Sequence, residues 1–154
     1  MYYSKKIYYF EKAGEANTEN VIKFALERAF ENHIGVIVVP TETGRSALLL
    51  KKYATQMNYT GDIIAVRYHT GFGRLNEQFM DDNTYNELIS MGVKIHTGTH
   101  LFSSVSRSFR IKWDGLYMPE IVGETLKIFG NGMKTAIEVA VMAANGGLIK
   151  DITQ

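Results

Sequence analysis

Residues 36–47 decide the fold class, and they read Val-Ile-Val-Val-Pro-Thr-Glu-Thr-Gly-Arg-Ser-Ala. The first four residues are all apolar and β-branched, which is typical of a strand buried on both faces of a parallel sheet. A turn rich in hydroxyl groups follows, and apolar residues then recur at helical spacing from Ala47 to Met57. The stretch therefore predicts a buried strand that ends in a polar turn and passes directly into a helix.

The same alternation of strand and helix continues along the chain. Apolar runs at 63–66 and 93–95 predict two further strands, parallel and adjacent to the first. A helix is expected after Asn17, which is a good capping residue. Another is expected over about 84–91, where Thr84 and Glu87 have the spacing of a capping box.

The remaining predicted elements complete an α/β fold. They are a short strand at 7–10, a loop with room for one short helix at 97–118, a helix from Pro119 to about 129, and a buried helix at 133–144 that is apolar nearly all round. Strands that alternate with helices predict a three-layer α/β/α sandwich with a mostly parallel sheet. We expect residues 1–154 to form one domain.

The composition excludes several classes of site. The chain has 154 residues, with 17 Lys and Arg against 16 Asp and Glu, and no cysteine. Disulfides, thiolate nucleophiles, zinc fingers and iron–sulfur clusters are therefore excluded. The near-neutral charge argues against nucleic acid as a partner. The N-terminus lacks the apolar core of a signal peptide, and no apolar run is long enough to span a bilayer, so we expect a cytoplasmic protein with no membrane partner.

Ligand-binding residues are expected where the strands end, because open parallel sheets bind their ligands at the carboxyl edge. In the turn 41–46, the helix start offers unpaired N–H groups, three side chains offer hydroxyls and Arg45 offers charge, which together suit a phosphate. Gly44 would let the backbone approach that phosphate closely. An ordinary helix cap explains the same residues equally well, and the lysine of a P-loop is missing.

The next two strands bring further candidates to the same edge. Tyr68 and Phe72 follow the second strand and could stack on a planar ring. His69 and His100 are the candidate acid–base groups, since histidine titrates near neutral pH. A metal site is not expected, because His96 and His100 lie four residues apart outside a helix and no carboxylate cluster accompanies them. The residues predicted to face the ligand are Thr41, Glu42, Thr43, Gly44, Arg45, Ser46, Tyr68, His69, Thr70, Gly71, Phe72, Thr97, Gly98, Thr99 and His100.

Three later features have more than one interpretation. The basic segment around Arg107 and Arg110 is either solvated or faces the ligand. Residues 130–135 fit a second phosphate-binding nest or a break between two helices. Glu138 lies in an apolar helix, where a carboxylate should be paired or face the ligand.

Residues 41–47, between an Ile/Val strand and the strand Ile-Ile-Ala-Val, resemble the C-terminal domain of pyruvate kinase. Over almost its whole length, the chain is similar to a family of small free-standing archaeal and bacterial proteins that are related to that domain. The segments that carry this resemblance are 9–12, 17–18, 68–72, 106–108, 129–134, Glu138 and 142–147.

The resemblance implies a pyruvate kinase C-terminal domain-like fold, a phosphate bound by residues 41–47, and flavin mononucleotide (FMN) as the cofactor. It implies no pyruvate kinase activity, because the catalytic barrel of that enzyme is absent. Members of the family continue beyond the segment 142–147 into another strand, whereas this chain stops at Gln154. We therefore expect that sheet position and its ligand contacts to be missing.

The function expected from these observations is binding of a phosphorylated ligand, FMN or a related nucleotide or sugar phosphate, at the carboxyl edge of the sheet. One alternative is an enzyme that acts on a phosphorylated metabolite with a histidine acid–base group. Another is a regulatory, effector-binding module without catalysis. A homo-oligomer is also expected, because an uncovered sheet edge or helix face would leave apolar surface exposed.

Overall fold

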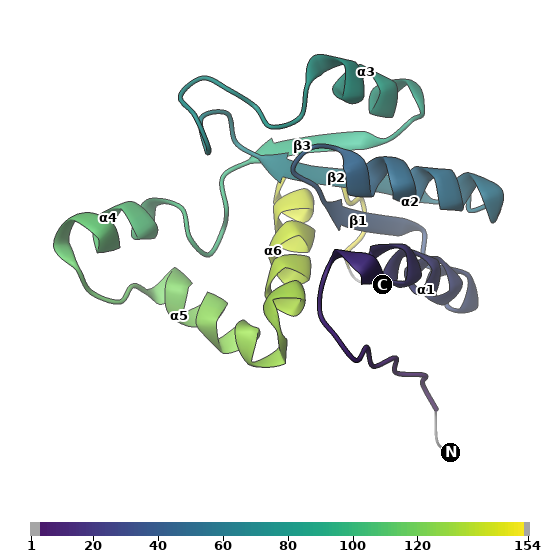
Figure 1. The fold of residues 1–154 in the computed structure, drawn as a ribbon, viewed down its shortest axis with the longest axis horizontal. Helices are drawn as coiled ribbons and strands as arrows, with labels where there is room; N and C mark the ends of the chain where they lie inside the picture. Colours follow the sequence, from purple (N-terminus) through teal and green to yellow (C-terminus); the bar gives the residue numbers. More distant parts are fainter. Residues whose placement is uncertain (1–3, 153–154) are drawn as a thin grey trace.

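Three parallel strands form the sheet, in the order β1-β2-β3 (Figure 1). In the computed structural model, which describes residues 4–152, these strands are β1 (Val36–Pro40), β2 (Asp62–Tyr68) and β3 (Lys94–Gly98). Val38 pairs with Ile64, and Ala65 pairs with Ile95. The three predicted strands and their parallel, adjacent arrangement are confirmed, and β3 extends further than expected, to Gly98.

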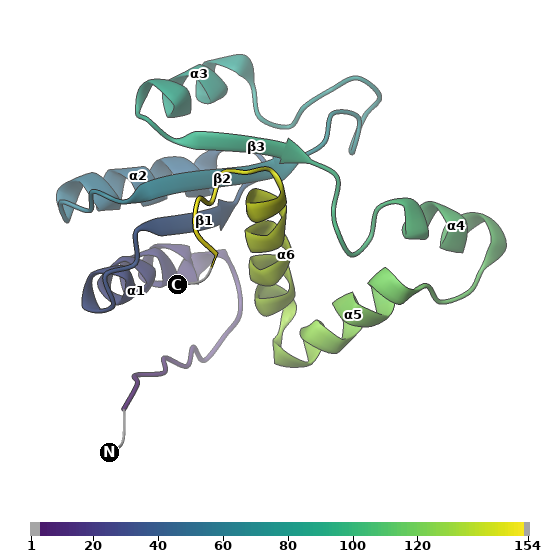
Figure 2. The same cartoon turned by 180° about the vertical axis from the view of Figure 1, so that it is seen from behind.

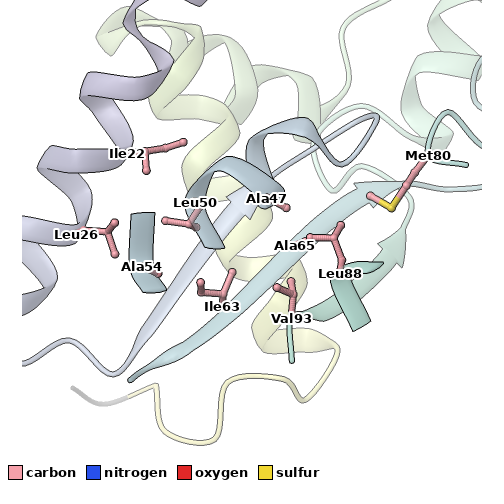
Figure 3. Packing of buried hydrophobic residues seen from close by; sticks show 10 residues of the cluster. All are labelled: Ile22, Leu26, Ala47, Leu50, Ala54, Ile63, Ala65, Met80, Leu88 and Val93. Carbon is pink, nitrogen blue, oxygen red and sulfur yellow. The ribbon is translucent and has the colours of Figure 1, made fainter. Parts of the chain in front are cut away.

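Helices cover both faces of the sheet because the residues of β2 alternate between them. Ile63 and Ala65 contact α1 (Thr18–Glu31), α2 (Arg45–Gln56) and α3 (Asp82–Ser90). Figure 3 shows this core, in which Leu26, Leu50 and Leu88 are fully buried. The uninterrupted apolar run of β2 is thus explained, because helices cover this strand on both faces of the sheet.

The other face of the sheet packs against α6 (Asn131–Asn145), which lies in front of the strands in Figure 2. Ile64 and Val66 of β2 contact Val139, Met142 and Ala143 of α6. The expectation that this helix is buried holds for one side, where Glu138, Val139, Met142 and Ala143 are buried, and not for the other, where Met133 and Val141 are 48% and 36% exposed.

Two short helices, α4 (Val105–Trp113) and α5 (Met118–Leu126), project from the sheet (Figures 1 and 2). A 3-10 turn, η2 (Lys127–Phe129), joins α5 to α6, and another, η1 (Glu15–Asn17), precedes α1. We call residues 105–129 the arm. Within the arm, α4 has no buried residue and α5 buries only Glu120 and Gly123.

Four local predictions are corrected. Residues 7–10 form no strand; instead the Tyr8 ring stacks on Phe24 of α1, with centroids 3.7 Å apart. Asn17 precedes α1, but its amide donates to the Lys12 carbonyl rather than capping the helix. α3 begins before Thr84, and its cap is Asp81, which accepts the Thr84 N–H at 2.9 Å.

The fourth correction concerns β1, whose residues from Val36 to Val39 are half-buried instead of fully buried, because β1 is an edge strand. No helix within residues 4–152 is long and apolar enough to cross a lipid bilayer.

Candidate functional site

A pocket of about 160 Å³ lies where the carboxyl ends of the strands meet α2 and α6. We call it the strand-end pocket. It brings together predicted residues from three separate loops, because parallel strands end at one edge of the sheet. Its predicted members are Thr41, Glu42, Ser46, Tyr68 and His100, and α6 adds Thr135, Val139 and Met142.

A second pocket, of about 460 Å³, lies between the loop after β2 and the base of the arm. We call it the arm-base pocket. His100 lines both pockets and is the residue that they share. The predicted residues His69, Gly71, Phe72 and Thr99 line the arm-base pocket together with Ser103, Ser104, Arg107 and Ser108.

The turn 41–46 is closed by one side-chain hydrogen bond, and within residues 4–152 no side chain caps α2 at its N-cap residue, Gly44. Thr41 is 8% exposed, and its hydroxyl oxygen accepts the Gly44 N–H at 3.0 Å. The first bond at the start of α2 runs from the Leu48 N–H to the Gly44 carbonyl, so the N–H groups of residues 45–47 have no carbonyl one turn back. The Gly44 N–H is therefore engaged within the turn, and the donors for an anion are those of the next three residues.

Arg45 faces away from both pockets. Its guanidinium forms an ion pair with Glu15, and both side chains are about two-thirds exposed. Together with Thr43, these residues line a different depression, between α1, α2 and α3. The turn thus divides its side chains, with Thr41, Glu42 and Ser46 on one side and Thr43 and Arg45 on the other.

Gly44 is required for packing. Its φ angle of +92° is one that other residues rarely adopt, and a Cβ atom there would collide with the Cγ2 atom of Thr84 in α3. The close approach that this glycine permits is to α3, whereas the sequence suggested an approach to a phosphate.

Aromatic rings form the boundary between the two pockets. The rings of Tyr68 and Phe72 stack in parallel with centroids 4.1 Å apart, and the His100 ring lies 4.6 Å from Tyr68. Burial raises the pKa of Tyr68, and the negative charges of Glu42 and Glu138 raise it further. Since Tyr68 and Phe72 use one face on each other, a ligand ring can stack only on a remaining face or on His100.

Glu138 is the polar centre of the site, and its side chain is fully buried. Its carboxylate accepts hydrogen bonds from His100 Nδ1 at 3.0 Å, from the Phe102 N–H at 2.8 Å and from Lys134. Burial alone would raise the pKa of Glu138, but the hydrogen bonds from His100, Lys134 and Phe102 outweigh it and lower the pKa to about 2. The sequence-based expectation of a paired carboxylate is correct.

The contact with Glu138 determines the tautomer of His100. An ionised carboxylate only accepts hydrogen bonds, so Nδ1 of His100 carries the proton and Nε2 is left for a ligand. A neutral His100 can therefore accept a proton at Nε2, and a charged one can donate it. His69 has no carboxylate partner; its Nδ1 atom is buried without a hydrogen-bond partner in the described part of the chain.

The remaining predicted residues line neither pocket. The Thr97 hydroxyl accepts a hydrogen bond from Arg67 Nε at 2.8 Å, and the Thr70 hydroxyl accepts one from Gln78 at 2.8 Å. At Gly98, a Cβ atom would lie 2.8 Å from His96 Nε2, so this glycine makes room for that ring. The predicted residues outside both pockets are Thr43, Gly44, Arg45, Thr70, Thr97 and Gly98.

Across residues 4–152, no group of three or more His, Asp and Glu side chains is placed to hold a metal ion. His96 packs beside Gly98 and Gly146, away from the pocket at which His69 and His100 converge.

Sequence reasoning missed Val139 and Met142 of α6 and Ser104 before α4, whereas Thr135 falls in the segment 130–135, which fits a phosphate-binding nest or a helix break. Thr135, Val139 and Met142 belong to a helix whose apolar pattern predicts burial but not which strand ends it reaches. The basic segment around Arg107 offered a signal, and Arg107 does line the arm-base pocket. A scan against protein-family models finds none that matches the chain.

Proposed function

We propose that this protein binds a phosphorylated ligand with a planar ring, FMN or a related nucleotide or a sugar phosphate, at the carboxyl edge of the sheet. The observation that carries the proposal is that the strand-end pocket and the arm-base pocket share His100. The resemblance to the pyruvate kinase C-terminal domain-like family supports it, as does the covering of both sheet faces by helices, which fits the three-layer architecture of such domains.

The sizes of the pockets suggest how such a ligand would lie. The strand-end pocket, at about 160 Å³, is smaller than the roughly 300 Å³ at which ligand sites usually begin, whereas the arm-base pocket, at about 460 Å³, is within the usual range. The phosphate then belongs in the strand-end pocket, beside Ser46 and the unpaired N–H groups at the start of α2. The ring belongs beyond His100, against Phe72.

The test uses two aspartate variants of one turn. Ser46→Asp places a carboxylate in the strand-end pocket, and Thr43→Asp places the same charge on the opposite side of the turn. Aspartate is tolerated near a helix N-terminus, so both variants should fold. With FMN as the calorimetric probe, and mass spectrometry to identify any copurified ligand, Ser46→Asp should weaken binding by about tenfold or more, whereas Thr43→Asp should change it little. Equal affinities in the two variants would contradict the proposal.

The second candidate function is an enzyme that uses His100 as its acid–base group on a phosphorylated metabolite. The hydrogen bond between His100 and Glu138 favours it, because such a carboxylate fixes the orientation of the ring and its tautomer. The same contact favours His100 over His69 for this role. A His100→Gln variant that retains ligand binding but loses turnover would support catalysis. A protein without turnover that sugar phosphates stabilise would instead fit the regulatory module.

We also propose that the arm is covered by a second copy of this chain. Ten large apolar side chains of the arm are each at least 40% exposed. They present about 1,000 Å² of apolar surface, against the roughly 800 Å² that each partner buries in a standard interface. The arm carries four basic and three acidic residues, so two copies can meet without strong repulsion. The ten residues are Val105, Phe109, Ile111, Trp113, Leu116, Met118, Ile121, Val122, Ile128 and Phe129.

A further inference from the structure

Arg107 carries the unpaired positive charge of the arm-base pocket. Within residues 4–152 it forms no ion pair and no hydrogen bond, whereas Arg45 pairs with Glu15 and Arg110 pairs with Glu120 at 2.8 Å. Of the other cations near the pockets, Lys134 is held by the buried Glu138, and Arg67 on the wall of the strand-end pocket donates to the Thr97 hydroxyl. An exposed guanidinium on a pocket wall is therefore free to bind a ligand.

The rest of the arm-base pocket suits a negative charge. Its described lining contains no Asp or Glu, and Ser103, Ser104 and Ser108 line it together with Arg107. His69 also lines the pocket, and its buried Nδ1 atom has no hydrogen-bond partner in the described residues, which is unfavourable. The strand-end pocket differs, because Glu42 is part of its wall.

We propose that the arm-base pocket binds an anionic oxygen group, a carboxylate or a phosphate, through Arg107 and the neighbouring serine hydroxyls. A guanidinium presents parallel N–H groups that match two oxygens of either anion. This inference deepens the proposed function and rests on it in one respect: a ligand that fills both pockets then carries an anionic group at each end. Its planar ring would lie between the two anionic groups, beyond His100 and against Phe72.

The experiment titrates the ¹⁵N-labelled protein with inorganic phosphate at constant ionic strength and follows the backbone amide signals by NMR. We expect two separate sets of shifts, one at residues 45–47 and one at residues 103–108. Arg107→Gln should weaken the second set by about tenfold or more and spare the first. Arg28→Gln removes the same charge from an exposed ion pair on α1, outside the pockets, and is the matched control, and it should change neither. A parallel titration with acetate tells whether the site prefers a carboxylate or a phosphate.

Three outcomes have distinct meanings. If residues 103–108 do not respond to either anion, or respond equally in Arg107→Gln, the inference is wrong. If Arg107→Gln loses the response and also unfolds at a lower temperature than the wild type in phosphate-free buffer, then Arg107 stabilises the fold instead of binding the anion. The inference is wrong in that case too. If only the set at residues 45–47 is missing, the phosphate position in the proposed function fails while the Arg107 site stands.

Discussion

Replacing Glu138 by glutamine should reduce the stability of the protein in a strongly pH-dependent way. The side chain is fully buried and its carboxylate accepts three hydrogen bonds. Its pKa falls from 4.5 to about 2 in the folded protein. Since one pKa unit corresponds to about 1.4 kcal/mol, the ionised group contributes about 3 kcal/mol to the free energy of unfolding.

The direction of the pH dependence follows from the lowered pKa. A carboxyl group whose pKa is lower in the folded state stabilises the fold at any pH above its unfolded value, here about 4.5. That contribution is lost progressively as the pH falls from 4.5 toward 2. The difference in unfolding free energy between the wild type and Glu138→Gln should therefore be about 3 kcal/mol at pH 7 and approach zero near pH 2.

The assay is urea unfolding of both proteins at several pH values from 7 to 2, followed by circular dichroism. The control is Glu124→Gln, which removes a glutamate that is also paired with a lysine but is 64% exposed. An exposed pair contributes a few tenths of a kcal/mol, so the control should follow the wild type throughout. A Glu138→Gln difference that stays constant from pH 7 to pH 2 would refute the assignment of that stability to the ionised carboxylate.

Three further predictions concern the turn, the arm and the aromatic boundary. Gly44→Ala should lower the free energy of unfolding by about 2 kcal/mol or more, because the backbone has a positive φ there and the new Cβ collides with Thr84. Adding Thr84→Ser removes the colliding methyl group and should restore part of that loss, measured by urea unfolding. If it restores nothing, the collision does not contribute to the loss. In light scattering, Ile111→Glu should convert the dimer into a monomer. The control Leu75→Glu, on an exposed loop outside the arm, should leave the dimer intact. A monomeric wild type at micromolar concentration would rule out the dimer. An ultraviolet titration of the wild type and of Tyr68→Phe shows which tyrosine signal the variant lacks, and we expect that phenol to ionise above pH 10. If the missing signal belongs to a phenol that ionises at or below pH 10, the burial of Tyr68 is contradicted.

The architecture was predictable because its signals are local in the sequence. A run such as Ile63 to Val66 is apolar at every position, and only a strand covered on both faces needs that pattern. The edge strand β1 has the same pattern with less burial, since coverage depends on its neighbours and not on its own residues. The strand expected at 7–10 failed for a related reason: its aromatic residues suit a strand, but they contact α1 instead of a pairing partner.

The candidate site shows most clearly which features follow from the local sequence and which depend on tertiary packing. The sequence by itself determined which loops meet at the carboxyl edge, because strand order and direction follow from the alternation of elements, and it marked Glu138 as a carboxylate that needs partners. Only the tertiary structure decided that Arg45 turns to Glu15 while Arg107 lines a pocket. The direction of a side chain from a turn depends on packing against distant elements, here α1 and α3 on one side and α6 on the other. Such contacts join residues far apart in the chain, and no local pattern encodes them.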